Sequence, residues 1–89
     1  MMVIKVLGPG CKNCERLEMH AVQAAEQVQA ENSNLEVTVE KVTDVDTFLD
    51  YGLLKTPGLV ISEKLVSSGR IPSPTQIAGW IEEALTQEE

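Results

Sequence analysis

The sequence predicts an α/β fold in the order strand, helix, strand, helix, strand, strand, helix. Three observations predict this order. An apolar run at residues 2–7 is followed, after a Gly-Pro-Gly turn, by about twenty residues with apolar positions three and four apart. Residues 35–42 then alternate between apolar and polar side chains, as a half-buried strand does. Two short apolar runs and a second helical pattern complete the chain.

The composition of the 89-residue chain fits one domain, residues 1–89, with a modest core, because 43% of its residues are hydrophobic. The net charge of −7 argues against a nucleic-acid-binding protein and against docking on anionic lipid. The apolar runs are far shorter than the roughly 20 residues that span a bilayer. No charged segment followed by an apolar stretch opens the chain. We therefore expect a cytoplasmic protein that binds neither nucleic acid nor membranes.

The first strand, residues 2–7, is apolar except for Lys5, as in a central strand covered on both faces. We expect Lys5 to reach the end of the sheet or to pair with an acid such as Glu36 or Glu40. The alternative is a part in proton transfer at nearby sulfur atoms. The next helix is expected at residues 12–31, with an apolar face formed by Cys14, Leu17, Ala21, Ala25 and Val28.

Residues 35–42 form a strand with one solvated face, so we place it near a sheet edge, and the strand–helix–strand order predicts a right-handed parallel crossover. Thr43-Asp44 precedes a short helix, residues 45–51, that Gly52 ends. We expect Phe48 and Leu49 of this helix to lie in the core.

The last third of the chain predicts a hairpin and a helix. Residues 59–62 and 65–68 are short apolar runs with a tight connection, which indicates an antiparallel pair. Ser73 can cap the last helix, with Pro74 at its first position and Gln76 completing a capping box. Trp80 lies at helical spacing from apolar neighbours, and we expect it in the core.

The two cysteines, Cys11 and Cys14, stand where the first helix begins. A disulfide between them closes too short a loop to stabilise the fold much, so the pair is expected to be redox-active or metal-binding. The helix N-terminus offers unpaired N–H groups and the positive end of the helix dipole. We therefore expect the pKa of Cys11 to lie below the roughly 8.5 of a free thiol. Cys11 is predicted to be exposed, and Cys14 to face inward.

The Cys-x-x-Cys motif at the start of the first helix and the Thr-Pro before the third strand resemble the thioredoxin fold in its minimal, glutaredoxin-sized form. More closely, the chain is similar to the small glutaredoxin-like thioredoxins, also called the redox-active disulfide protein 2 family. Residues 7–14, 55–58 and 68–73 carry the resemblance. It implies a four-stranded mixed sheet with three helices, two on one face and one on the other. It also implies a cis Pro57 lying against the cysteines.

The same resemblance implies a thiol–disulfide oxidoreductase that reduces protein disulfides through a mixed disulfide, and so serves in electron transport. Cys11 would be the nucleophile and Cys14 the resolving cysteine. The residues expected to contact the substrate are Gly10, Lys12, Asn13, Thr56 and Pro57. We expect a monomer with no metal and no cofactor beyond the redox-active disulfide. Its expected partners are disulfide-containing proteins and a thioredoxin-reductase-like electron donor.

Several features depart from the family patterns, and one of them is that Gly10 stands where thioredoxins place a tryptophan. The dipeptide between the cysteines is Lys-Asn, where thioredoxins have Gly-Pro and most dithiol glutaredoxins have Pro-Tyr. Lys5, six residues before Cys11, stands where thioredoxins bury an acid that assists proton transfer. Of the Gly-Gly-Asp glutathione motif of glutaredoxins only Gly69 is present. Arg70 follows it, and its side chain can still pair with a carboxylate.

Two other functions are compatible with the cysteine pair. Heavy-metal-associated domains place the same motif between a first strand and a first helix and bind Cu(I) or zinc through the thiolates. Their signature has methionine where Pro9 stands, however, and their chain ends in a strand. The second function is a binding module whose thiols only regulate an interaction. Turnover of a model disulfide favours the oxidoreductase, whereas stoichiometric metal uptake without turnover favours the soft-metal carrier.

Overall fold

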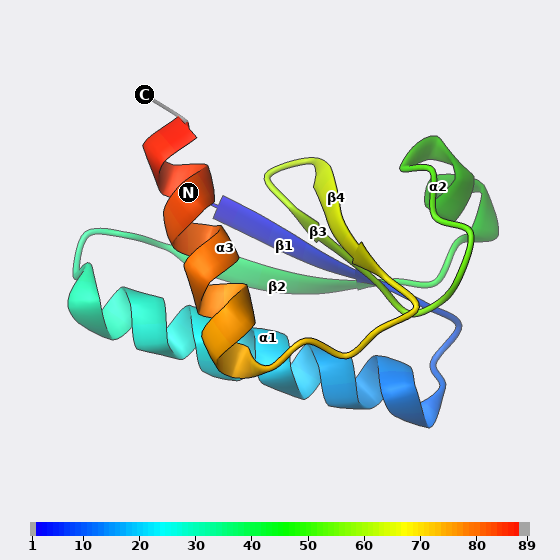
Figure 1. Ribbon diagram of the computed structural model, residues 1–89, viewed down its shortest axis with the longest axis horizontal. Helices are drawn as coiled ribbons and strands as arrows, with labels where there is room; N and C mark the ends of the chain where they lie inside the picture. Colours follow the sequence, from blue (N-terminus) through cyan, green and yellow to red (C-terminus); the bar gives the residue numbers. More distant parts are fainter. Residues whose placement is uncertain (1, 88–89) are drawn as a thin grey trace.

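The computed structural model describes residues 2–87 and has the predicted order of elements. The elements are β1 (Met2–Leu7), α1 (Lys12–Glu31), β2 (Val37–Val42), α2 (Val45–Asp50), β3 (Gly58–Ile61), β4 (Lys64–Ser68) and α3 (Pro74–Gln87). The four strands form one sheet in the order β2-β1-β3-β4 (Figure 1). β1 and β2 are parallel, and the other two pairs are antiparallel. The predicted mixed sheet with three helices is thereby confirmed.

Alternate residues of the sheet divide its two faces between the helices, because successive side chains of a strand point to opposite sides. On one face, α1 and α3 bury a core that includes Ile4, Leu17 and Ile77, each with no exposed surface. On the other face, α2 and the segment after it bury a smaller cluster: Leu7, Phe48, Leu53 and Val60. Two helices thus cover one face and one covers the other, as the family resemblance implied.

Local hydrogen bonds explain where β2, α2 and α3 begin. Leu35 lies before β2 because its N–H donates to the Asn32 carbonyl across a turn (2.9 Å), so this strand starts later than the alternation suggested. Asp44 caps α2 by accepting from the Asp46 N–H (3.1 Å). At α3, the Gln76 N–H donates to Ser73 Oγ and the Ser73 N–H donates to Gln76 Oε1, each at 3.2 Å. This reciprocal pair is the predicted capping box.

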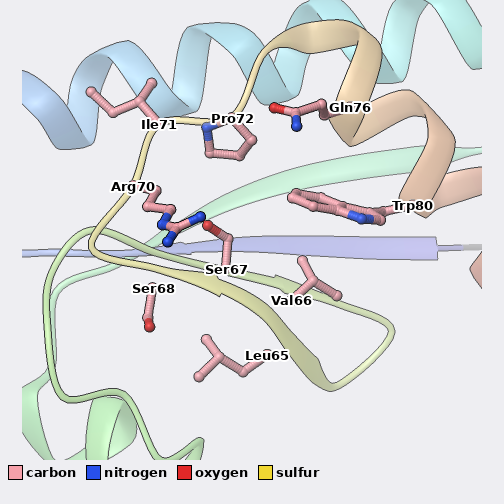
Figure 2. Close-up of a pocket in the computed structure, with 9 residues that line it drawn as sticks. All are labelled: Leu65, Val66, Ser67, Ser68, Arg70, Ile71, Pro72, Gln76 and Trp80. Carbon is pink, nitrogen blue, oxygen red and sulfur yellow. The ribbon is translucent and has the colours of Figure 1, made fainter.

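The prediction that Leu49 lies in the core is wrong: its side chain is 63% exposed, whereas Phe48 is 6% exposed. Neighbouring helix residues point about 100° apart, so a six-residue helix lying on a sheet turns only one of the two inward. Leu53, just after the helix, fills the remaining space. Trp80 packs against the larger core but is only half-buried, so the expectation of a core position is met in part (Figure 2).

Within residues 2–87, none of the helices combines the length and the hydrophobicity that a bilayer crossing requires.

Candidate functional site

The turn between β1 and α1 brings the two cysteines to one end of the sheet. Gly8 extends the strand pairing, since its N–H donates to the Val42 carbonyl (3.0 Å). Gly10 has φ +93°, a left-handed conformation that glycine adopts without the steric penalty of a Cβ. The chain then enters α1 with Cys11 as its N-cap residue.

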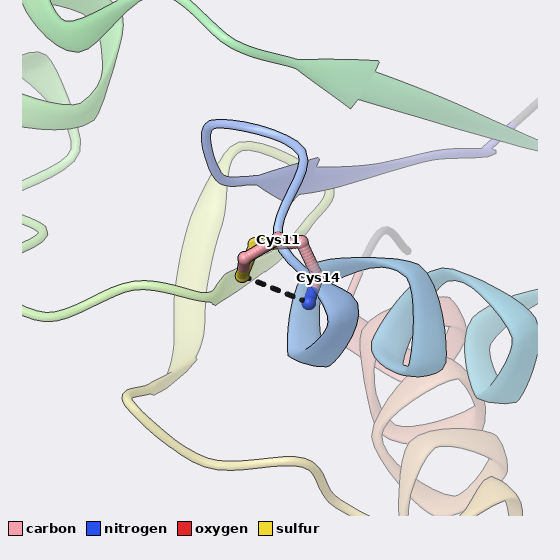
Figure 3. Close-up of a disulfide and its surroundings, with 2 residues drawn as sticks. All are labelled: Cys11 and Cys14. Carbon is pink, nitrogen blue, oxygen red and sulfur yellow. Dashed lines mark hydrogen bonds between the residues drawn. A yellow bond between two sulfur atoms is a disulfide. The ribbon is translucent and has the colours of Figure 1, made fainter.

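Cys11 and Cys14 form a disulfide across the first turn of α1 (Figure 3). Cys11 has an extended backbone (φ −76°, ψ 168°), and its Sγ accepts a hydrogen bond from the Cys14 N–H at 3.2 Å. The sulfur therefore takes the place that a serine or aspartate oxygen usually takes in capping a helix. Cys11 is exposed, whereas Cys14 is 6% exposed and faces inward. This is the unequal exposure that the helical periodicity predicts.

Gly8 makes room for the inner sulfur, a role that the sequence pattern did not reveal. The residue is buried, and a Cβ built on it would overlap Cys14 Sγ and lie 3.1 Å from Cys14 Cβ. The same Cβ would be 3.9 Å from Pro57 Cβ. Gly8, Cys14 and Pro57 therefore meet at one point, although Pro57 follows the cysteines by more than forty residues.

The Thr56–Pro57 segment forms the second wall of the site, just before β3. Its peptide bond is cis. Pro57 is buried and its carbonyl accepts from the Gly69 N–H (2.8 Å), whereas Thr56 is exposed. The other three predicted substrate contacts, Gly10, Lys12 and Asn13, are also exposed, at the cysteine turn. The structure thus brings the five predicted contact positions to the same end of the sheet as the disulfide.

A small cavity of about 40 Å³ lies against Cys14, between the cysteine turn and the end of β2. Its lining includes Cys14, Glu15, Lys41 and Thr43. A cavity of this size is large enough for a water molecule. Glu15 lies at the cavity because it directly follows Cys14, whereas the packing of β2 against α1 brings Lys41 there.

In the part of the chain that the structure describes, no group of three or more His, Cys, Asp or Glu side chains is placed to hold a metal ion. Two thiolates alone leave half of a tetrahedral coordination sphere unfilled.

Lys5 lies on the face of the sheet that carries α2 and takes part in a polar cluster. Its Nζ donates to Tyr51 Oη at 2.8 Å and to Glu63 Oε1 at 3.1 Å, and Tyr51 Oη also donates to Glu63. The prediction of Glu36 or Glu40 as its acid partner is therefore wrong. The end of α2 and the β3–β4 turn bring Tyr51 and Glu63 over Lys5, which strand patterns do not reveal. The pKa of Glu63 is lowered, mainly by the hydrogen bond that it accepts from Tyr51 and next by the one from Lys5. The pKa of Lys5 is raised, mainly by its hydrogen bond to Tyr51 and next by the one to Glu63.

Comparison with known proteins places this geometry in a family. Residues 2–82 match a family model described as a thioredoxin domain. The thioredoxin of Methanothermobacter thermautotrophicus is 34% identical over 77 residues, which cover 86% of this chain and 94% of that protein. The thioredoxin of Methanocaldococcus jannaschii is 30% identical over 77 residues, which cover 86% of this chain and 83% of that one.

Among solved structures, the zinc-bound form of human ERp44 matches with a TM-score of 0.66 over 92% of this chain. The sequence identity is 17%, and the match spans 26% of that longer protein, so the likeness supports the fold alone. The family model and the two archaeal relatives carry the assignment further. The chain belongs to the thioredoxin family, and the Cys11–Cys14 pair that it carries at the start of α1 indicates thiol–disulfide redox activity.

Proposed function

We propose that this protein is a protein disulfide reductase in which Cys11 is the nucleophile and Cys14 the resolving cysteine. The observation that supports this most is the unequal exposure of the two sulfur atoms at the start of α1. A partner disulfide can approach Cys11 from solvent, while Cys14 is shielded from it. Two equally exposed thiols would both react with partners.

In the reduced protein, the Cys11 thiolate attacks one sulfur of the partner disulfide. A mixed disulfide forms, and the other partner sulfur leaves as a thiolate that takes up a proton. Cys14 then loses its proton and attacks Cys11 Sγ, which forms the Cys11–Cys14 disulfide and releases the second partner sulfur as a thiolate. The α1 N-terminus favours the charged form of Cys11, because its N–H groups and dipole are positive there. Lys12, one residue further on, adds a positive charge near the sulfur atoms.

The partner segment that carries the disulfide is proposed to lie along Thr56. This residue is exposed and precedes the buried Pro57, so its main-chain groups are open to an added strand. Gly10, Lys12 and Asn13 would contact the same segment from the cysteine turn. The protein would act as a monomer in the cytoplasm and need no metal or other cofactor. A thioredoxin-reductase-like donor would return the two electrons that each cycle consumes.

Cysteine variants test this proposal in an assay that follows reduction of a model protein disulfide. Cys11→Ser is expected to abolish turnover while leaving the fold intact, because serine caps helices well. Cys14→Ser is expected to accumulate a mixed disulfide between Cys11 and the partner, which mass spectrometry detects. The double variant gives the background rate.

Three outcomes contradict the proposal. If Cys14→Ser turned over as fast as the wild type, Cys14 would not resolve the intermediate. If mixed disulfides formed through Cys14 in the Cys11→Ser variant at the wild-type rate, the roles would be reversed. Tight, stoichiometric uptake of zinc or Cu(I) by the reduced protein, without disulfide turnover, would replace the reductase with a soft-metal carrier.

A further inference from the structure

A groove of about 520 Å³ runs along β4, beneath the connector to α3 and the first turns of that helix (Figure 2). Residues 65–68 form one side, and Arg70, Gln76 and Trp80 are among the residues of the other. None of the residues that the resemblance assigned to the thiol site lines it. Its volume is within the roughly 300–1,000 Å³ of typical ligand sites. The groove is therefore a separate feature of the surface that the redox chemistry does not explain.

The groove is rich in hydrogen-bond donors and contains no carboxylate among the described residues that line it. This is unusual in a chain with 14 acidic and 7 basic residues. Arg70 supplies a guanidinium group, and Ser67 and Ser68 supply hydroxyls. Gln76 Oε1 is occupied by the Ser73 N–H, which leaves the amide NH₂ of Gln76 as a donor. Such a lining fits an anionic group on the ligand.

Two side chains at opposite ends of the groove indicate a ligand with two parts. Arg70 is exposed and, among the described residues, has no ion pair or hydrogen bond. Figure 2 shows its guanidinium turned toward Ser67, with the indole of Trp80 further along the groove. Trp80 is half-buried and offers an apolar surface. The arrangement suits a carboxylate at one end and an apolar group at the other.

The strand beside the groove indicates that this ligand is an extended peptide. β4 is the last strand of the sheet and pairs only with β3, so no strand in residues 2–87 pairs with its outer edge. Such an edge can pair with an added strand, whose successive side chains on one face lie two residues apart. The end of β4 is also joined to the thiol site, because the Gly69 N–H donates to the Pro57 carbonyl at 2.8 Å. A peptide in the groove therefore lies next to the wall at which the disulfide partner is proposed to bind.

We propose that the groove between β4 and α3 binds an extended segment of a partner protein that carries an acidic side chain two residues from an apolar one. The carboxylate pairs with Arg70, and the apolar side chain packs on Trp80. The segment holds a partner beside the cysteines without contacting them. The purpose of this docking rests on the proposed reductase function. Binding of the segment to the groove does not depend on the thiol chemistry and can be measured without disulfide turnover.

A fluorescence titration tests the proposal, because Trp80 is the single tryptophan of the chain. The probe is the peptide acetyl-Thr-Glu-Thr-Leu-Thr-amide, and its matched control has glutamine in place of glutamate. The acidic peptide is expected to change the Trp80 emission saturably and to bind about tenfold more tightly than the glutamine peptide. Isothermal titration calorimetry should give the same dissociation constants.

Arg70→Gln is expected to weaken binding of the acidic peptide about tenfold and to remove the preference for glutamate over glutamine. Arg16→Gln is the matched control, since it removes the same charge from an exposed arginine of α1 that lies outside the groove. It should leave the preference unchanged. The Cys11→Ser/Cys14→Ser variant should bind the peptide like the wild type, which separates this proposal from failure of the reductase proposal.

Four results would overturn the inference. The first is the absence of saturable binding, and the second is a preference for glutamate that survives Arg70→Gln. The third is binding of N-acetylglutamate amide as tightly as the peptide, which would assign the groove to a small anion. The fourth is that the wild-type protein binds no peptide but is a dimer in analytical ultracentrifugation, and that Trp80→Phe or Arg70→Gln makes this dimer dissociate. That result would assign the groove to a second copy of the chain.

Discussion

The two faces of the sheet differ greatly in how much core they hold. Among the described residues, the α1 and α3 face buries a cluster of twelve residues, whereas the α2 face buries a cluster of four. α1 has 20 residues and α2 has 6. Large apolar side chains also remain exposed on and beside α2, namely Val45, Leu49 and Leu54. Most of the hydrophobic stabilisation therefore comes from one face.

The two sides of the thiol site, the cysteine turn and the Thr56–Pro57 segment, therefore belong to regions of different stability. Cys11 and Cys14 begin α1, which the large cluster holds. Thr56 and Pro57 follow the α2 segment, whose packing depends largely on Phe48 and Leu53. Regions with few buried contacts open locally at lower free energy than the core does. We expect the Thr56–Pro57 wall to be the one that adjusts to different partners.

The largest expected effect is at the centre of the large cluster. Leu17→Ala is expected to lower the free energy of unfolding by about 2–5 kcal/mol, because Leu17 is completely buried and its truncation leaves a cavity. Urea denaturation followed by circular dichroism measures this loss. Met19→Ala, at a side chain that is 60% exposed, is the control and should change stability by about 0.5 kcal/mol or less. Equal losses in the two variants would contradict the comparison.

A smaller and more local effect is expected on the other face. Leu53→Ala should cost about 2 kcal/mol, at the low end of such truncations, because the α2 segment can relax around the missing side chain. Hydrogen exchange should quicken at the amides of Gly52 and Leu53, which donate to Leu49 and Phe48, while the α1 amides stay protected. Faster exchange spread evenly over α1 and α2 would show that the two faces unfold as one unit.

The smallest effect is expected from the polar cluster of Lys5, Tyr51 and Glu63, because Glu63 is exposed although Lys5 and Tyr51 are half-buried. The pKa of Glu63 is lowered in the folded protein, so its charge stabilises the fold above the ordinary value of 4.5. That contribution disappears as the pH falls through the lowered pKa. The contribution of Lys5, whose pKa is raised, is present below 10.5 and is lost as the pH rises through the raised pKa.

Glu63→Gln should therefore be slightly less stable than the wild type at neutral pH and equally stable in acid. Chemical denaturation at a series of pH values measures the difference between the two proteins. Glu26→Gln, at an exposed glutamate of α1, provides the control. A difference that persisted unchanged into strong acid would mean that the Glu63 charge has no part in it.

Local signals in the sequence were sufficient for the order of the elements and for the site at the start of α1. Glycine and proline punctuate the turns, the period of apolar residues separates helix from strand, and the Ser73–Gln76 pair is a capping signal that acts within four residues. The unequal exposure of Cys11 and Cys14 follows from helical periodicity in the same way.

Features that depend on which elements meet in space could not be predicted in this way. Lys5 finds its partners just after α2 and on the β3–β4 turn, not on the neighbouring strand. Gly8 appeared to be turn punctuation, although its missing Cβ is what admits Cys14 Sγ. The groove beside Arg70 forms only because β4, the connector to α3 and the first turns of α3 surround one space. Each of these needs the tertiary arrangement, on which sequence spacing carries no information.

The sulfur of Cys11 takes part in the disulfide and also caps the N-terminus of α1, since it accepts the Cys14 N–H. When the disulfide opens, this acceptor becomes a thiolate or a thiol according to pH, and a charged acceptor holds an N–H more strongly than a neutral one. The chemical shift of the Cys14 amide proton is consequently expected to report the oxidation and ionisation state of the Cys11 sulfur. A single resonance in a ¹⁵N-labelled sample would follow both without any added dye.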